Sequence, residues 1–541
     1  MSNQQKTKNK KNPEELEWKG MIGATCAVGV YIFLFLFLVV YAFYFKDGYT
    51  QIATVKFEFL KKVSIYFAYF MIPLAVLHGV LPTKYGKQAG KGLPERIYEA
   101  RNSFSATDLF VFSYALVFFI SYLVTEYQDE AAWGTSGWFM GLGTQLICVG
   151  IYFFVSRYYD GKIDLMPYIM AVTFILFFWG LLNRFSVYPV AMKFSAPAFI
   201  SSMGNINWFC GYWTVFYAIG IIYYMLEETM IKRVAYGIYV AVALGLGIVE
   251  GSDSAFVSLV IVFLVLFWLS FSKRSLMKRF LEIGIIFSLS CQVMRLISLV
   301  WPYSLNKEET LVKLFLGNLT LITLIVLAGI RVLLAVGQKK SSIQDASLKK
   351  WFWIWILMIG ILAAGLVIYL VLLYMNTTHR GSIGALSASQ NFYLDQSWAN
   401  GRGGSWRDGF AIFFSLPFWQ KWVGVGPDCF AVYGYSHDAI RNLLIGQFAN
   451  SRLTNAHNEC ITLLADVGIL GLGSFLGLVW SSIARCMKRG LRDPYFYIFA
   501  LCLLSYFWNN MFSFQQIENL PFFFFMLGLA EWNLRSRTEH A

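Results

Sequence analysis

Long apolar runs separated by short polar segments make up most of this 541-residue chain. A run of about 20 mostly apolar residues is what an α-helix needs to cross a bilayer. The pattern therefore predicts an all-α polytopic membrane protein with about fourteen transmembrane helices, and roughly 12–14 as the range. The predicted spans lie near 20–45, 61–81, 106–126, 137–156, 164–183, a run opened by 203–212 and closed at Lys232, 234–250, 255–272, 280–301, 316–338, 352–375, 469–485, 495–513 and 519–534.

Lysine and arginine recur in every second segment that connects these runs. In membrane proteins such residues mark cytoplasmic loops, so this alternation predicts that both termini are cytoplasmic. The pattern divides the chain into a basic cytoplasmic tail, a bundle of about eleven spans, a large extracytoplasmic loop with short helices, about three further spans and a short cytoplasmic tail. The corresponding boundaries are 1–19, 20–375, 376–467, 468–534 and 535–541.

Composition supports this class and excludes others. Hydrophobic residues make up 57% of the chain and charged residues only 14%, which no soluble globular protein of this size matches. The net charge of +13 resides largely in predicted inner loops, so it does not indicate a nucleic-acid partner. The eight cysteines include no CxxC pair, which argues against a structural zinc site.

A polar opening at 454–460 runs directly into an apolar helical pattern. Thr454 or Asn455 is expected to cap this helix, which places His457 in its first turn. The partial positive charge at a helix N-terminus disfavours imidazolium, so His457 is expected to stay neutral and able to accept a proton. The free N–H groups of the same turn suit a phosphate. The competing interpretation is that His457 only caps a loop.

The predicted outer segment 376–467 contains no long apolar run, and such loops host function more often than packing. Its glycine-rich stretch 401–408 includes Arg402 and Trp406. Arginine binds phosphate oxygens in a bidentate manner, and tryptophan stacks on sugars or lies at a membrane interface. A flexible loop with a solvated arginine is the alternative interpretation.

Further positive charges lie in predicted outer segments, where topology does not require them. Arg441 and Arg452 precede His457 along the chain, while Arg184 and Lys193 flank an earlier outer segment. Their positions favour an anionic ligand over a merely solvated face.

Other polar pairs offer different sites. His437 and Asp438 form a rival base–carboxylate pair in the outer loop. The carboxylates around Glu250 supply too few oxygen ligands for a metal, so neither a metal nor a cofactor is expected. Cys429 and Cys460 both fall in the outer segment, where a disulfide between them and two free thiols are both open.

Several of these stretches together resemble the O-antigen ligase/polymerase superfamily, which comprises bacterial integral membrane glycosyltransferases. They are 204–209 at the opening of a span, Arg402 with Trp406 leading to 424–430, and 457–471. The strongest similarity lies in the last stretch, with its His-Asn start and Gly-Ile-Leu-Gly end. The resemblance covers 200–212 and 400–475 together with the overall topology.

The resemblance implies transfer of a glycan from undecaprenyl diphosphate at the outer face of a bacterial cytoplasmic membrane. His457 would take the proton of the acceptor hydroxyl, and Arg402 would neutralise the leaving diphosphate. An inverting, metal-independent reaction follows if the attack is direct. The other candidate residues for binding diphosphate or substrate are Arg441, Arg452, Arg184, Lys193, Asn205, Asn207, Trp406 and Asn458.

The sequence departs from the family pattern at two positions. Ile206 stands where the family often has proline, and no arginine follows Ser252 where a Ser-Arg pair is common. Within the family, a polymerase is favoured over a ligase because nothing indicates a lipid A or protein acceptor. A lipid-linked oligosaccharide flippase and a structural partner in an envelope assembly are the alternatives from other classes. Membrane lipids are further expected partners, and a chain-length regulator is left open.

Overall fold

The computed structural model describes residues 13–81, 103–301, 310–339, 348–448 and 452–536. Nearly all regular structure is helical, and the described sheet is a two-stranded antiparallel hairpin that pairs Phe199 with Asn205. The chain is an all-α polytopic membrane protein. The elements are α1 (Pro13–Phe35), the π-helix η1 (Leu36–Tyr41), α2 (Ile52–Val80), α4 (Ala106–Val124), α5 (Gln128–Trp133), α6 (Leu142–Tyr158), α7 (Met166–Arg184), β1 (Phe199–Ile200), β2 (Gly204–Asn205), α8 (Ile206–Leu226), α9 (Met230–Val249), α10 (Asp253–Ser270), α11 (Arg274–Val300), α12 (Thr310–Phe315), α13 (Asn318–Lys339), the 3-10 helix η2 (Lys349–Trp351), α14 (Trp353–Thr378), the 3-10 helices η3 (Gly384–Ala388) and η4 (Gln390–Phe392), α15 (Trp398–Ser415), α16 (Gln420–Val423), α17 (Phe430–Ser436), α18 (Asp438–Phe448), α19 (Glu459–Asp466), α20 (Gly468–Gly490), α21 (Phe496–Asn509) and α22 (Leu520–Ser536).

Eleven helices within the described ranges are long and apolar enough to cross a membrane. The predicted spans near 137–156, 495–513 and 519–534 correspond to the shorter helices α6, α21 and α22, of 17, 14 and 17 residues. The sequence places these three helices correctly, and the total of about fourteen spans stays a prediction. Residues 1–12 and 537–541 of the predicted tails lie outside the described ranges, and α1 already begins at Pro13 within the predicted tail.

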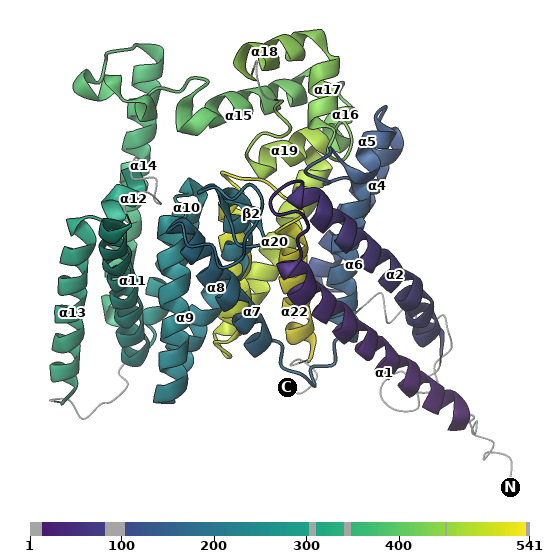
Figure 1. Ribbon diagram of the computed structural model, residues 1–541, viewed down its shortest axis with the longest axis horizontal. Coiled ribbons are helices and arrows are strands. Elements are labelled where there is room, and N and C mark those ends of the chain that lie inside the picture. Colours follow the sequence, from purple (N-terminus) through teal and green to yellow (C-terminus); the bar gives the residue numbers. More distant parts are fainter. Residues whose placement is uncertain (1–12, 82–102, 302–309, 340–347, 449–451, 537–541) are drawn as a thin grey trace, which may run out of the picture.

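The most buried helices form the centre of the bundle. In the apolar stretch of α8, 89% is buried inside the protein, and the first twelve residues of α22, Leu520 to Glu531, are all buried. Only 6% of the apolar windows of α13 and α14 is buried, which leaves their side chains to contact lipid. In Figure 1 these two helices lie on one flank, α1 and α2 lie on the other, and α8, α20 and α22 lie between them.

The short helices α15–α19 gather at one end of the bundle, at the top of Figure 1. We call this the capped end. These helices all belong to the segment 376–467, for which the sequence predicted no span. The glycine-rich stretch 401–408 is helical rather than a flexible loop, although Ala399, Asn400 and Gly401 adopt left-handed backbone angles at its start.

The opposite end, which we call the basic end, carries a network of ion pairs between helices. The buried carboxylate of Asp108 pairs with Arg157 at 2.8 Å and with Arg535. Glu531, also buried, pairs with Arg535 at 2.9 Å and with Arg485. These contacts join α4, α6, α20 and α22, so the network ties together helices that are distant in sequence.

A break at Gly468 separates α19 from α20. Gly468 has φ +68°, and a Cβ atom there would lie 2.4 Å from the backbone carbon of Trp422. The left-handed turn therefore ends α19 and starts the membrane-spanning α20 in a new direction. Cys429 and Cys460 are free thiols in the structure.

Replacing Gly468 by alanine is expected to lower the free energy of unfolding by about 2 kcal/mol or more, because a left-handed conformation and a backbone clash both oppose the added methyl group. Thermal unfolding of the purified protein in detergent measures the effect. Gly473→Ala is the matched control on the same helix, since its Cβ would meet no atom within 4 Å. Equal unfolding midpoints for the two variants would contradict the left-handed, closely packed backbone at Gly468.

Candidate functional site

His457 lies just before α19, not in its first turn as the sequence predicted. The helix begins one residue after Asn458, whose side-chain oxygen accepts a hydrogen bond from the Ile461 amide at 3.1 Å. Asn458 therefore caps the helix, three or four residues later than expected. His457 itself has φ +50°, and its amide donates to the side chain of Asn455 at 3.0 Å. This turn presents the imidazole beside the helix end rather than on it.

The His457 imidazole has no hydrogen-bond partner among the described residues, and its Nδ1 atom is fully buried. Its ring meets the edge of Phe514 with centroids 5.3 Å apart. Burial, and after it the nearby charge of Arg402, lowers the pKa of His457 to about 4. The imidazole is thus neutral at pH 7, as expected, but because of burial and Arg402 rather than a helix terminus.

Arg402 is held rigidly in α15 by two backbone carbonyls. Its Nε donates to the Phe512 oxygen and its Nη1 to the Ala399 oxygen, both at 3.0 Å. Nη1 also lies 3.5 Å from Asp253 Oδ2. The remaining Nη2 group makes no hydrogen bond to any residue that the structure describes, so it is available to an anion.

The link between α21 and α22 contacts Arg402, His457 and the neighbour of His457, Asn458. The Phe512 carbonyl accepts from Arg402, the Met511 carbonyl accepts from Asn458 at 2.9 Å, and the Phe514 ring contacts His457. Sequence reasoning missed this link because it assigned 495–513 to a span. The polar run Asn509–Asn519 between two apolar helices was the signal that could have revealed it.

A chain of polar contacts connects Arg402 to the start of α8. Asp253 accepts a 3.3 Å hydrogen bond from Asn400, and its neighbour Ser252 donates to Asn207 at 3.0 Å. Asn205 caps α8 by accepting from the Asn207 amide at 2.9 Å. The structure thus brings Asn205 and Asn207 into the same connected region as Arg402. Asp253 makes direct contact with Arg402, although the sequence analysis did not include Asp253 among the candidate site residues.

Trp406 packs beside the α21–α22 link, with its ring centroid 6.0 Å from that of Phe512 and 5.6 Å from that of Trp398. Its buried indole N–H has no hydrogen-bond partner among the described residues. The glycine at 403 lets α15 approach the preceding segment, because a Cβ atom there would lie 2.1 Å from the Asp395 carbonyl oxygen.

The other predicted cations contact different partners. Arg184 is buried and donates to the Val249 carbonyl at 2.7 Å, while Lys193 lies 3.6 Å from Asp47. Arg441 pairs with Asp438 at 2.5 Å, and Arg452 lies over the Tyr435 ring. None of these contacts involves Arg402 or His457.

The rival pair His437 and Asp438 is separated. His437 stacks on the Tyr433 ring at 3.9 Å, and its Nδ1 lies 2.9 Å from the Tyr433 carbonyl oxygen. Asp438 instead faces Arg441. The two side chains therefore form no base–carboxylate dyad.

Behind the site, three buried carboxyl groups surround a small internal cavity. Asp428, Glu459 and Asp466 line a space of about 30 Å³, which is enough for one or two water molecules. Burial raises the pKa of Asp428 to about 7 and that of Glu459 to about 8, and it raises that of Asp466 well above its usual range. Within the described ranges, no cluster of three or more His, Cys, Asp or Glu side chains has the geometry of a metal site.

No protein-family model matches this sequence, and a search of curated proteins gives no significant match. Fold and site alone define the class: a multi-pass helical membrane protein whose capped end places a neutral histidine near a largely buried arginine.

Proposed function

We propose that this protein is a membrane glycosyltransferase that polymerises glycan units from a polyprenyl-diphosphate donor at the outer face of the cytoplasmic membrane. The observation that carries the proposal is the pairing at the capped end. A neutral imidazole without a hydrogen-bond partner in the described chain lies near a largely buried guanidinium whose Nη2 group makes no hydrogen bond there. A base next to an anion site is what transfer from a phosphate-linked donor requires.

The reaction follows from these two side chains. The acceptor hydroxyl oxygen attacks the anomeric carbon of the donor and forms the new glycosidic bond. His457 takes the hydroxyl proton during this attack. The bond between the anomeric carbon and the diphosphate oxygen breaks, and Arg402 Nη2 stabilises the negative charge that develops on the leaving group. A single displacement of this kind inverts the anomeric configuration.

The surrounding residues support the two catalytic groups. Arg402 and Asn458, the neighbour of His457, both donate to the α21–α22 link, which therefore fixes the positions of the base and the cation. Trp406 presents an apolar wall beside Phe512, where a sugar ring can stack. The lipid-facing helices around the bundle offer apolar surface to the polyprenyl chain.

The decisive experiment is turnover by the purified protein in lipid with a short polyprenyl-diphosphate-linked glycan. Longer lipid-linked products are expected from a polymerase. Consumption of the donor only after a second acceptor is added would identify a ligase. Movement of the donor across the bilayer without any product would show that the protein is a flippase and not a transferase. Product with retained anomeric configuration would contradict direct displacement.

The pH dependence of kcat/KM tests the base. With a pKa of about 4, His457 stays deprotonated from about pH 5 upward, so the rate should be flat there and fall only as imidazolium forms below about pH 4. A solvated histidine would instead lose activity below about pH 6.5. Single-turnover rates across this range distinguish the two cases. A break near pH 6.5 would contradict the buried, neutral imidazole.

A further inference from the structure

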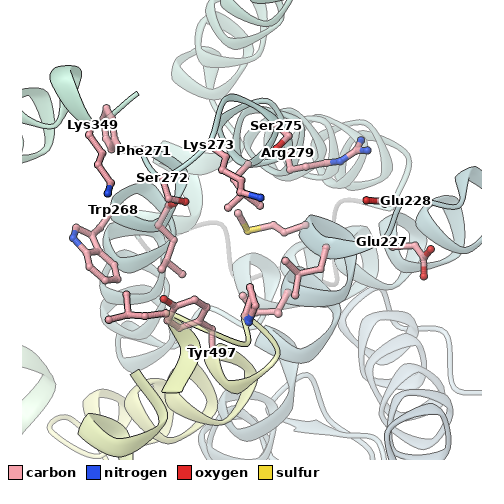
Figure 2. A pocket seen from close by; sticks show the side chains of 18 of the residues that line it. Glu227, Glu228, Trp268, Phe271, Ser272, Lys273, Ser275, Arg279, Lys349 and Tyr497 are labelled. Carbon is pink, nitrogen blue, oxygen red and sulfur yellow. The ribbon is translucent and has the colours of Figure 1, made fainter. Parts of the chain in front are cut away.

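A cavity lined by apolar and charged residues lies at the basic end, far from the candidate catalytic site. Its volume is about 670 Å³, within the range of sites that bind small molecules. It lies where the ends of α8 and α10 and the starts of α11, α14 and α21 meet the loop that follows α20 (Figure 2). Its position at these helix ends puts it at the level of a membrane–water interface.

The walls of the cavity are largely apolar. The side chains of Trp268, Leu269, Leu276, Phe352 and Leu491 line it. Trp351 and Trp353, on either side of Phe352, are about half exposed, at 46% and 53%. Tryptophan prefers the headgroup level of a bilayer, so these residues indicate that the cavity borders lipid rather than bulk water.

Two lysines add positive charge to the mouth of this apolar cavity. Figure 2 shows Lys273 and Lys349 on different walls, and both line the space. The Leu348 amide donates to the Phe271 carbonyl at 3.2 Å, which fixes the backbone next to Lys349 against the turn that holds Lys273. A pair of ammonium groups above an apolar floor complements an anion that carries a hydrocarbon chain.

Three other charged residues line the cavity, namely Arg279, Glu227 and Glu228, and the first two face away from it. Figure 2 shows Arg279 and Glu227 directed outward, away from the centre of the cavity. Arg279 pairs there with Glu282 at 2.9 Å, and Glu227 accepts from the Thr229 amide at 2.8 Å. Lys273 and Lys349 are the other cationic residues that line the cavity.

Tyr497 provides an independent polar contact. The residue is only 7% exposed, it lines the cavity, and its hydroxyl has no hydrogen-bond partner among the described residues. Figure 2 shows the hydroxyl directed into the space. Gly490 lets the ring occupy this place, because a Cβ atom there would lie 2.5 Å from the Tyr497 ring. A hydroxyl that opens into the cavity from a largely buried residue suits a ligand with an acceptor oxygen, such as a phosphate.

From this cavity we infer that the basic end binds one anionic phospholipid, with its phosphate near Lys273, Lys349 and Tyr497 and an acyl chain against the apolar wall. The binding is noncovalent and independent of the proposed transferase activity. Positive residues of membrane proteins face the cytoplasm, so the lipid would come from the inner leaflet.

Native mass spectrometry of the full-length protein, released from detergent after incubation with phosphatidylglycerol or phosphatidylcholine, tests this inference. One phosphatidylglycerol is expected to bind more tightly than phosphatidylcholine. Each lysine near a lipid surface contributes about fivefold in affinity, so Lys273→Gln with Lys349→Gln should weaken binding about 30-fold. Tyr497→Phe keeps the ring and should weaken binding about tenfold through the lost hydrogen bond.

Lys162→Gln is the matched control, because Lys162 is an exposed lysine at the same end and does not line the cavity. It should bind phosphatidylglycerol like the wild type. Inorganic phosphate added in excess separates the two sources of the anion, and a lipid site should keep its phosphatidylglycerol. Displacement by phosphate alone would mean a site for the free ion. Equal binding of both lipids, or unchanged binding by the double-lysine and Tyr497→Phe variants, would overturn the inference.

Discussion

Replacing His457 by alanine is expected to reduce turnover of the lipid-linked donor by about 10²–10⁴-fold. This is the usual contribution of a positioned general base, and neither ring nitrogen is held by another group in the described chain. The measurement is single-turnover product formation with saturating donor, because that rate reports the chemical step rather than binding. The KM for the donor should change little, since the imidazole is proposed to act on the acceptor hydroxyl.

His379→Ala is the control for this loss, because His379 is an exposed histidine in the same outer segment, beside Thr378. It should retain wild-type turnover. His457→Gln keeps a polar side chain of similar size but has no basic nitrogen, so it should be as inactive as His457→Ala. Activity in the glutamine variant would assign His457 a structural role. Monodisperse elution and an unchanged unfolding midpoint show that each variant is folded.

Replacing Arg402 by alanine should cost about 10²–10³-fold in turnover, the effect of losing one preorganised donor to a developing negative charge. A donor with a better leaving group than a diphosphate should be affected less, because it needs less charge stabilisation. The comparison of two donors therefore separates leaving-group stabilisation from general misfolding. Equal losses with both donors would contradict the proposed role of Arg402.

Arg402→Lys should recover only part of this activity. The guanidinium binds the Phe512 and Ala399 carbonyls and keeps Nη2 unbonded in the described chain. An ammonium group is a point charge without this planar fork, so it cannot reproduce all three directions. Arg380→Ala is the matched control, as Arg380 is an exposed arginine of the outer segment that lies over the Tyr393 ring.

The sequence predicted the membrane class because apolar runs about 20 residues long, repeated along most of a chain, are typical of membrane-spanning helices. It also singled out His457 and Arg402, since a histidine and an arginine in a long polar segment stand out in such an apolar chain. It misplaced the start of α19, because Thr454, Asn455 and Asn458 are all good caps and only packing selects among them.

The features of the site that the sequence did not predict depend on contacts between residues far apart in the chain. The low pKa of His457 depends on burial and on Arg402, which lies 55 positions earlier in the chain. The contact between Asp253 and Arg402 joins the start of α10 to α15, and no local pattern indicates it. The α21–α22 link was hidden because its phenylalanines and methionine extend the apolar run of the preceding helix.

This link has a consequence for the geometry of the capped end. Arg402 and Asn458 come from separate segments of the outer loop, yet both bind consecutive carbonyls of one short turn on the most buried helices. The α21–α22 link thus holds both Arg402 and the segment that carries His457. In the proposed transferase, the separation of the two groups is therefore set by the membrane core and not by the outer helices α16–α18, which carry neither of them.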